Sequence, residues 1–239
     1  MTQPNTHSTL RTMALVAGTG LLAMTVCAVG AIAFVFEKHI VPGNAIATVG
    51  NILAGETQFR MGIAALLAVA ILDVLVAWAL YVFFAPANKN LSLLAAWFRL
   101  VYAAMLGVAL SGYTHVLRLL ETIHSTAAGE VTPLHADVMR SLRAFDDGWA
   151  MGLVFFGIHL LILGYLVFRC GYTPKVLGFA LVIAGAAYVM DGFGRFLLPH
   201  HNLQLATWVG WMEALWMVWL LYKGLTGSPI RQARPEIIG

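Results

Sequence analysis

Long apolar runs, separated by polar segments, make up most of this chain. Six apolar runs are each long enough to cross the hydrocarbon core of a bilayer, which takes about 20 helical residues. They cover residues 12–36, 61–84, 91–120, 148–168, 176–198 and 203–221. In lipid every backbone polar group must be satisfied internally, and a helix does this within one segment. The pattern predicts an all-α fold, a polytopic membrane helical bundle with six transmembrane helices between residues 12 and 222.

The polar segments between and around these runs predict smaller elements. Residues 1–11 and 223–239 are expected to be cytoplasmic tails. After the first span, Pro42-Gly43 predicts a turn and Asn44 an N-cap, followed by a short interfacial helix over residues 45–53. Residues 137–147 have the pattern of an amphipathic surface helix that lies before the fourth span.

The distribution of Lys and Arg near the helix ends predicts the orientation. One side carries basic residues in short, acid-poor segments: Arg11, Lys89, Arg169, Lys175, Lys223, Arg231 and Arg234. The other side carries them in longer segments rich in Asp and Glu: Lys38, Arg60, Arg118, Arg140, Arg143 and Arg195. Both termini are therefore predicted to lie in the cytoplasm.

Composition agrees with this class of protein. The chain is 60% hydrophobic and 10% charged, whereas soluble globular chains carry about 25% charged residues. The formal charge of +3 comes from a few side chains near helix ends, which suits lipid headgroups, and no basic stripe suggests nucleic acid. No metal, cofactor or common catalytic motif is predicted, and an enzyme is not the favoured class.

Every span except the first carries an ionisable residue. These are Asp73, Arg99, His159, Asp191 with Arg195, and Glu213. At helical spacing, each of these positions shares a face with Gly or Ala residues, which mark helix–helix contacts in membranes because they let backbones approach closely. The six side chains are therefore predicted to point into the bundle as a buried polar network or ligand-binding site.

Spacing and depth also predict partners within this set. Arg99 is the nearest counter-charge for Asp73, and Asp191 precedes Arg195 by one turn, which favours an i,i+4 pair. Glu56 and Arg60 repeat this arrangement at the outer end of the second span. With His159 neutral, the interior carries one negative charge in excess, so either one carboxyl is protonated or His159 is charged.

Several functions fit such an interior. The leading hypothesis is a site that binds, senses or transports a small polar or amphipathic ligand or a lipid. A membrane enzyme would use His159 as acid or base beside a carboxylate of Glu213 or Asp73. A structural or accessory subunit would use the same charges to fix helix register. Haem is disfavoured because His115 and His159 differ in depth by roughly 15 Å of helix rise.

Four separated segments resemble one family. They read HIVPGNAIATVGNILAGETQFRMG, DVLVAWALYVFFAPANKNLSLLAAWFRLV, GLVFFGIHLLILGYLVFRCGYTPKVLG and YVMDGFGRFLLP. In this order they resemble the bacterial integral-membrane proteins of domain-of-unknown-function family 4386, over roughly residues 14–221. The chain has Asn44 where that family commonly carries an acid. The resemblance implies a six-helix multipass protein in the cytoplasmic membrane of a bacterium, and no established activity.

Overall fold

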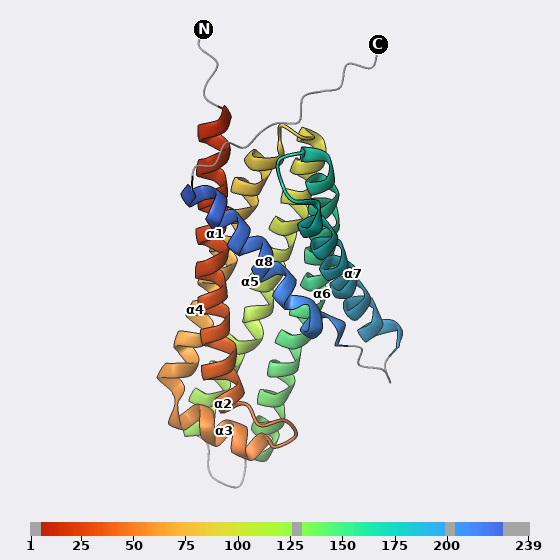
Figure 1. Cartoon of the computed structure of the whole chain (residues 1–239). Coiled ribbons are helices and arrows are strands. Elements are labelled where there is room, and N and C mark those ends of the chain that lie inside the picture. The colour runs from red at the N-terminus through yellow and green to blue at the C-terminus, as the bar shows by residue number, and fades with distance from the viewer. Residues whose placement is uncertain (1–5, 126–130, 199–203, 227–239) are drawn as a thin grey trace, which may run out of the picture. The chain divides into compact units, whose positions relative to one another are not determined.

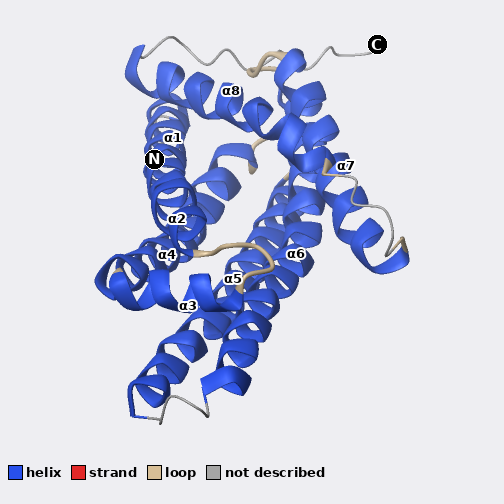
Figure 2. Cartoon of the chain, turned by 90° about the horizontal axis from the view of Figure 1, so that it is seen from below, coloured by secondary structure: helices blue, strands red, loops and turns tan. Residues whose placement is uncertain are grey.

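The computed structural model describes residues 6–125, 131–198 and 204–226. Within these ranges all regular secondary structure is helical (Figures 1 and 2). The elements are α1 (Thr6–Ala31), the π-helical turn η1 (Ile32–Phe36), α2 (Glu37–His39), α3 (Ala45–Ala54), α4 (Glu56–Phe84), α5 (Lys89–Ser125), α6 (Val131–Cys170), α7 (Lys175–Leu197) and α8 (Leu205–Thr226). The predicted all-α class is confirmed.

Five helical segments of the described chain are long and apolar enough to cross a membrane. They are Ser8–His39, Glu56–Phe84, Lys89–Ser125, Thr132–Cys170 and Lys175–Leu197. They correspond to the first five predicted spans. The sixth predicted span corresponds to α8, which has 22 residues and is not among these five segments. This is a multipass membrane protein, and the structure supports five of its six predicted spans.

Several helix boundaries differ from the prediction. α1 begins at Thr6, within the expected N-terminal tail, and α8 continues to Thr226. Residues 137–147 are not a separate surface helix, because α6 runs without a break from Val131 to Cys170. The single Gly148 weakens a helix by about 1 kcal/mol without ending it. At about 1.5 Å per residue, α5 and α6 are both longer than the roughly 30 Å hydrocarbon core.

The connection between α1 and α4 agrees with its prediction. The side chain of Asn44 accepts a hydrogen bond from the backbone N–H of Ala47, at 2.9 Å, and so caps α3. Pro42-Gly43 forms the preceding turn, where Gly43 has a φ of 76°. This left-handed conformation favours glycine because it has no Cβ. The short helix begins at the residue where the sequence predicts it.

The chain divides into two compact units. Unit 1 comprises residues 1–22, 73–102 and 153–239, and unit 2 comprises residues 23–72 and 103–152. Unit 1 contains α7 and α8, the first part of α1 and of α5, and the last part of α4 and of α6. Unit 2 contains η1, α2, α3 and the remaining parts of those four helices.

Glycines set the close helix contacts of unit 1. A Cβ at Gly157 of α6 would lie 2.7 Å from the carbonyl oxygen of Gly185 in α7, and one at Gly185 would lie 2.6 Å from that of Gly157. Two turns further, Gly164 and Gly178 make a similar approach. These distances are shorter than a side-chain atom tolerates, so only glycine permits this packing. Such small-residue contacts are a main source of helix association in lipid.

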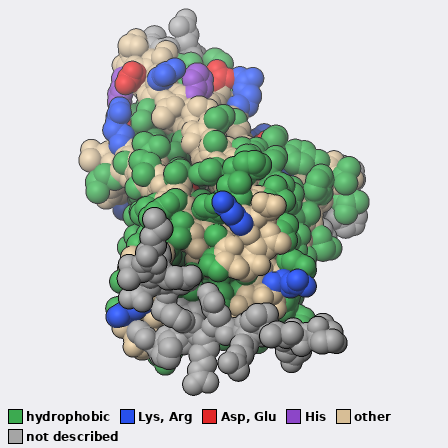
Figure 3. Space-filling model, turned by 90° about the horizontal axis from the view of Figure 1, so that it is seen from above, with side chains coloured by type: hydrophobic (Ala, Val, Ile, Leu, Met, Phe, Trp, Pro, Cys, Tyr) green, Lys and Arg blue, Asp and Glu red, His purple; other side chains and the backbone are tan. Residues whose placement is uncertain are grey.

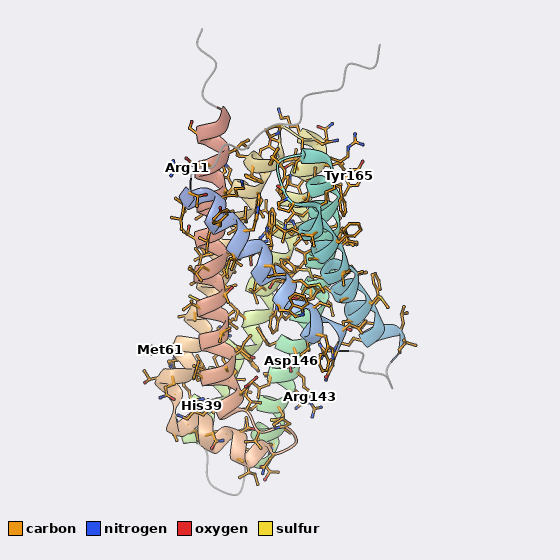
Figure 4. The ribbon with its side chains drawn as sticks, viewed as in Figure 1. Arg11, His39, Met61, Arg143, Asp146 and Tyr165 are labelled. Atoms are coloured by element: carbon orange, nitrogen blue, oxygen red, sulfur yellow. The ribbon has the colours of Figure 1, made fainter. Side chains whose placement is uncertain are left out.

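The start of α1 packs against the end of α8 in unit 1. A Cβ at Gly224 would lie 2.8 Å from the Cα of Leu15. Arg11 donates hydrogen bonds from Nε to the carbonyl of Gly224, at 2.9 Å, and from Nη2 to that of Leu225, at 3.2 Å (Figure 4). A cation at a helix C-terminus satisfies free carbonyl groups and opposes the negative end of the helix dipole.

An aromatic cluster forms the core of unit 2. The rings of Tyr113 and Phe145 stack with centroids 3.9 Å apart. Phe36 contacts Tyr113 at 4.5 Å and Phe59 at 5.4 Å, the second in an edge-to-face arrangement. All four side chains are at least 95% buried. Together they tie η1 and the adjacent turns of α4, α5 and α6 into one packed core.

The surface is rich in exposed apolar side chains, and hydrophobic groups cover much of the face shown in Figure 3. Large examples include Phe34, Val108, Val176, Phe179 and Trp208, each more than 60% exposed. Soluble monomers rarely carry contiguous apolar surface of this extent. In a helical membrane protein these side chains face lipid.

Candidate functional site

The centre of the candidate site is an ion pair between α4 and α5 of unit 1. Arg99 Nη2 lies 2.7 Å from Asp73 Oδ1, and the side chains are 2% and 0% exposed. Asp73 lies roughly three helical turns before the end of α4, and Arg99 the same distance after the start of α5. Because the two helices are joined by only four residues, they bring these side chains to one level. The predicted pairing of Asp73 with Arg99 is confirmed.

His159 extends this pair onto α6. Its Nε2 lies 3.3 Å from Arg99 Nη1, and its Nδ1 lies 2.8 Å from the carbonyl oxygen of Ala95. A guanidinium only donates and a carbonyl only accepts. Nε2 must therefore accept, and Nδ1–H must donate. The geometry assigns His159 the neutral tautomer with its proton on Nδ1, so the trio of Asp73, Arg99 and His159 is electrically neutral.

Phe156 forms a wall beside this trio. The guanidinium carbon of Arg99 lies 5.4 Å from the centre of the Phe156 ring, within the range of a cation–π interaction. Tyr102 packs against the same ring at 4.9 Å, His159 at 5.9 Å and Tyr188 at 5.5 Å. Sequence reasoning did not include the two tyrosines or Phe156. The available indication was that Phe156 lies one turn before His159, on the same face of α6.

Glu213 of α8 bonds to a residue outside the predicted set. Its Oε1 accepts a hydrogen bond from the hydroxyl of Tyr188 on α7, at 2.7 Å. Glu213 is partly buried. Gly210, expected on a helix contact, is exposed, and a Cβ there would meet nothing within 4 Å. Tyr188, which bonds to Glu213, packs against Phe156 at 5.5 Å, and the ring nitrogens of His159 bond to Arg99 and Ala95, not to Glu213.

Asp191 and Arg195 lie apart from this network. Both carboxylate oxygens of Asp191 accept backbone hydrogen bonds from α8, one from Leu205 at 2.9 Å and one from Ala206 at 2.6 Å. Asp191 therefore caps the N-terminus of α8, where a negative charge is favoured. Arg195 is exposed near the end of α7. The expectation that Arg195 points into the bundle is wrong, because this last turn of α7 presents it at the surface.

The outer-end pair lies in unit 2 and has the predicted geometry. Arg60 Nη2 lies 2.8 Å from Glu56 Oε1, and Nε donates to the same oxygen at 2.8 Å. Glu121 of α5 lies 3.7 Å from Arg60. These side chains are a third or more exposed. Exposed pairs of this kind contribute about 0–1 kcal/mol.

Side chains that could bind a metal ion do not cluster in the described residues of either unit. No group of three or more His, Cys, Asp and Glu side chains there could hold a metal ion. The groups gathered in unit 1 can instead offer hydrogen-bond acceptors, one fixed cation and aromatic faces. This arrangement suits recognition of a polar or charged group.

Comparisons with known proteins agree with the architecture. A protein-family model described as Domain of unknown function (DUF4386) matches residues 16–224. The chain is also 37% identical over 156 residues to a protein of Archaeoglobus fulgidus described as an uncharacterized protein, covering 65% of this chain and 79% of the relative. No solved structure matches. The match spans all the residues of the ion-pair network, and the chain belongs to the DUF4386 family of domains of unknown function.

Proposed function

We propose that unit 1 binds a small polar or amphipathic ligand, or a lipid, at the network of Asp73, Arg99 and His159, and that this binding serves sensing or transport. The observation that carries the proposal is the state of Asp73. One of its oxygens pairs with Arg99, while Oδ2 is buried and has no hydrogen-bond partner in the described part of the chain. A buried polar group without a partner costs about 1–3 kcal/mol, and more when charged. A hydrogen-bond donor on a ligand would remove this cost.

The charges around the site favour one class of ligand. Asp73 and Arg99 neutralise each other, and His159 is neutral in its hydrogen-bonded tautomer. Glu213 has no Lys or Arg within ion-pair distance in the residues described. A ligand with hydrogen-bond donors or a positive charge would therefore be attracted, whereas an anion would face two carboxylates.

A membrane enzyme that uses His159 receives less support. The enzyme hypothesis needs a carboxylate within hydrogen-bond reach of the imidazole. Both ring nitrogens of His159 are already engaged, one by Arg99 and the other by the Ala95 carbonyl. An imidazole held in this way acts as a fixed acceptor for Arg99.

We further propose six spans, with both termini in the cytoplasm of a bacterium and α8 as the sixth span. At about 1.5 Å per residue, the 22 residues of α8 reach roughly 33 Å, and a tilted helix of this length can cross a bilayer. The hydrogen bonds from Arg11 to the end of α8 support placing the two termini on the same side of the membrane. A C-terminal fluorescent-protein fusion should be bright, and a C-terminal alkaline-phosphatase fusion inactive. The reverse result would refute this orientation.

Native mass spectrometry of the protein released from its own membranes tests the binding proposal. The informative variant is Asp73→Asn with Arg99→Gln, which removes both charges while keeping similar shapes. Its matched control is Asp137→Asn with Arg140→Gln, which removes the exposed ion pair of α6. Wild type and control should carry a bound small molecule or lipid that the network variant lacks.

Two results would contradict the proposal. One is wild-type protein that carries no bound molecule above non-specific lipid. The other is a network variant that folds and retains the same bound molecule. Either result would favour a structural subunit, in which the buried charges only fix helix register.

A further inference from the structure

A polar cavity lies in unit 2, where α2, α3 and α4 meet. Its volume is about 550 Å³, and its lining includes Lys38, His39 and the first turn of α4. We propose that this cavity binds a phosphate monoester group, on either a small phosphorylated ligand or a lipid headgroup. All its residues belong to unit 2, so the proposal is independent of the function assigned to unit 1.

His39 is the buried polar side chain of this cavity (Figure 4). It is 3% exposed, and its Nδ1 donates to the carbonyl of Val35 at 2.6 Å. The other ring nitrogen, Nε2, lies beside Gly55 and has no hydrogen-bond partner in the described residues. Gly55 and His39 both line the cavity, so a group held there can approach Nε2.

Gly55 makes room for the His39 ring. A Cβ at Gly55 would collide with His39 Nε2. The backbone of Gly55 has a φ of −121°, which any residue adopts. Space, and not backbone conformation, therefore explains glycine at this position.

The first turn of α4 supplies backbone donors to the same cavity. Residues Glu56–Gln58 line it, and the N–H groups of a first helical turn have no acceptor within their own helix. Gly55, which precedes this turn, has no side chain to cap them. The N-terminus of a helix also carries a partial positive charge, so this end of α4 favours an anion.

Lys38 adds a full positive charge beside this turn. Its Nζ lies 3.4 Å from Gln58 Oε1, which places the ammonium next to the start of α4. The carboxylate of Glu56 also lines the cavity, but it is paired with Arg60 at 2.8 Å. Lys38 is therefore the charged lining residue that can attract a ligand. The cavity thus offers an ammonium, several N–H donors and a buried imidazole.

A phosphate monoester matches this set of groups. It has three acceptor oxygens for the ammonium and the backbone donors, and its second pKa of about 6 leaves a proton that can be shared with His39 Nε2 near neutral pH. A phosphodiester lacks that proton. A cation would meet mostly donors, because the one carboxylate is already paired.

Titration of the full chain in phosphatidylcholine nanodiscs tests the proposal, with inorganic phosphate as one probe and phosphatidic acid, added to the nanodiscs, as the other. Lys38→Gln should weaken binding about tenfold, as expected for loss of one charge-assisted hydrogen bond. Gly55→Ala should weaken it by a similar factor, because its Cβ displaces His39. Lys89→Gln removes an exposed lysine at the start of α5 and should leave the affinity unchanged.

The two probes separate the possible sources of the phosphate. Saturable binding of inorganic phosphate that depends on Lys38 supports a small phosphorylated ligand. Binding of phosphatidic acid alone, with the same dependence, supports a lipid headgroup. Failure of both probes overturns the proposal, as does equal affinity in Lys38→Gln and wild type. Because Lys38 is exposed, this variant stays informative if Gly55→Ala does not fold.

Discussion

The two compact units differ in buried charge, although both bury aromatic rings. In the part of the chain that the structure describes, the fully buried charges, Asp73 and Arg99, both lie in unit 1. Unit 2 instead packs Phe36, Phe59 and Tyr113 with Phe145 around a buried aromatic centre. Aromatic packing depends on volume and shape, whereas a buried ion pair depends on both charges being present. The comparison predicts that unit 1 responds to loss of charge and unit 2 to loss of volume.

The largest effect should come from breaking the ion pair. Asp73→Asn keeps the shape of the side chain but leaves Arg99 as an uncompensated buried charge, so we expect a loss of about 3–5 kcal/mol in the free energy of unfolding. The double variant Asp73→Asn with Arg99→Gln should be less destabilised than this single variant. Unfolding in mixed micelles measures both. A double variant that is less stable than the single would show that the pair is not coupled as described.

Removing a ring from unit 2 should have a slightly smaller effect. Phe145→Ala removes the side chain that stacks on Tyr113 and opens a cavity, for which we expect a loss of about 3 kcal/mol. Phe145→Leu keeps much of the volume and serves as the control, with a loss of about half that size. The same unfolding assay applies. If both variants match wild type, the aromatic centre does not stabilise unit 2.

Substitution of His159 tests whether it supports Arg99. His159→Phe keeps an aromatic ring but removes the acceptor for Arg99 Nη1 and the donor to the Ala95 carbonyl. Buried groups left without partners cost about 1–3 kcal/mol, so we expect a loss near 2 kcal/mol. His159→Gln can replace both hydrogen bonds and should recover part of it. Equal stability of the two variants would argue against the assigned tautomer.

The smallest effect should come from the exposed pair of unit 2. Glu56→Gln removes the charge that pairs with Arg60, where both side chains are accessible to solvent. The expected change in the free energy of unfolding is below about 0.5 kcal/mol. A loss comparable to that of Asp73→Asn would remove the distinction between buried and exposed pairs.

Short-range geometry explains which parts of the site could be predicted from sequence. Glu56 and Arg60 are one helical turn apart, so the helix itself brings them together. Asp73 and Arg99 lie at equal distances from a short connection, so an antiparallel hairpin places them at one level. In both cases the partner follows from spacing along the chain.

Other contacts depend on helix rotation and tilt, which spacing does not determine. The membrane-enzyme alternative required His159 beside a carboxylate, but the packing of α6 on α5 turns it toward Arg99 and the Ala95 carbonyl. Glu213 bonds to Tyr188 of the neighbouring helix. Arg195 lies in the last turn of α7 and is exposed, whereas the adjacent Gly194 is buried.

The fold, like the site, was predicted in part and missed in part. Apolar run length predicted the first five spans and Asn44 predicted the start of α3. The continuity of α6 was missed because polar residues 137–147 were expected to separate from the apolar run. That continuity follows from helix propensity without an interior breaker, since Gly148 alone does not end a helix.

The most direct test of the central claim is a high-resolution density map of the full chain purified with native lipid. The proposal predicts density for a bound molecule, larger than a single water, within hydrogen-bond distance of Asp73 Oδ2 and beside Phe156. Side chains closed around Oδ2, with no such density in protein that has kept its native lipids, would contradict a ligand site and leave the buried charges with a structural role.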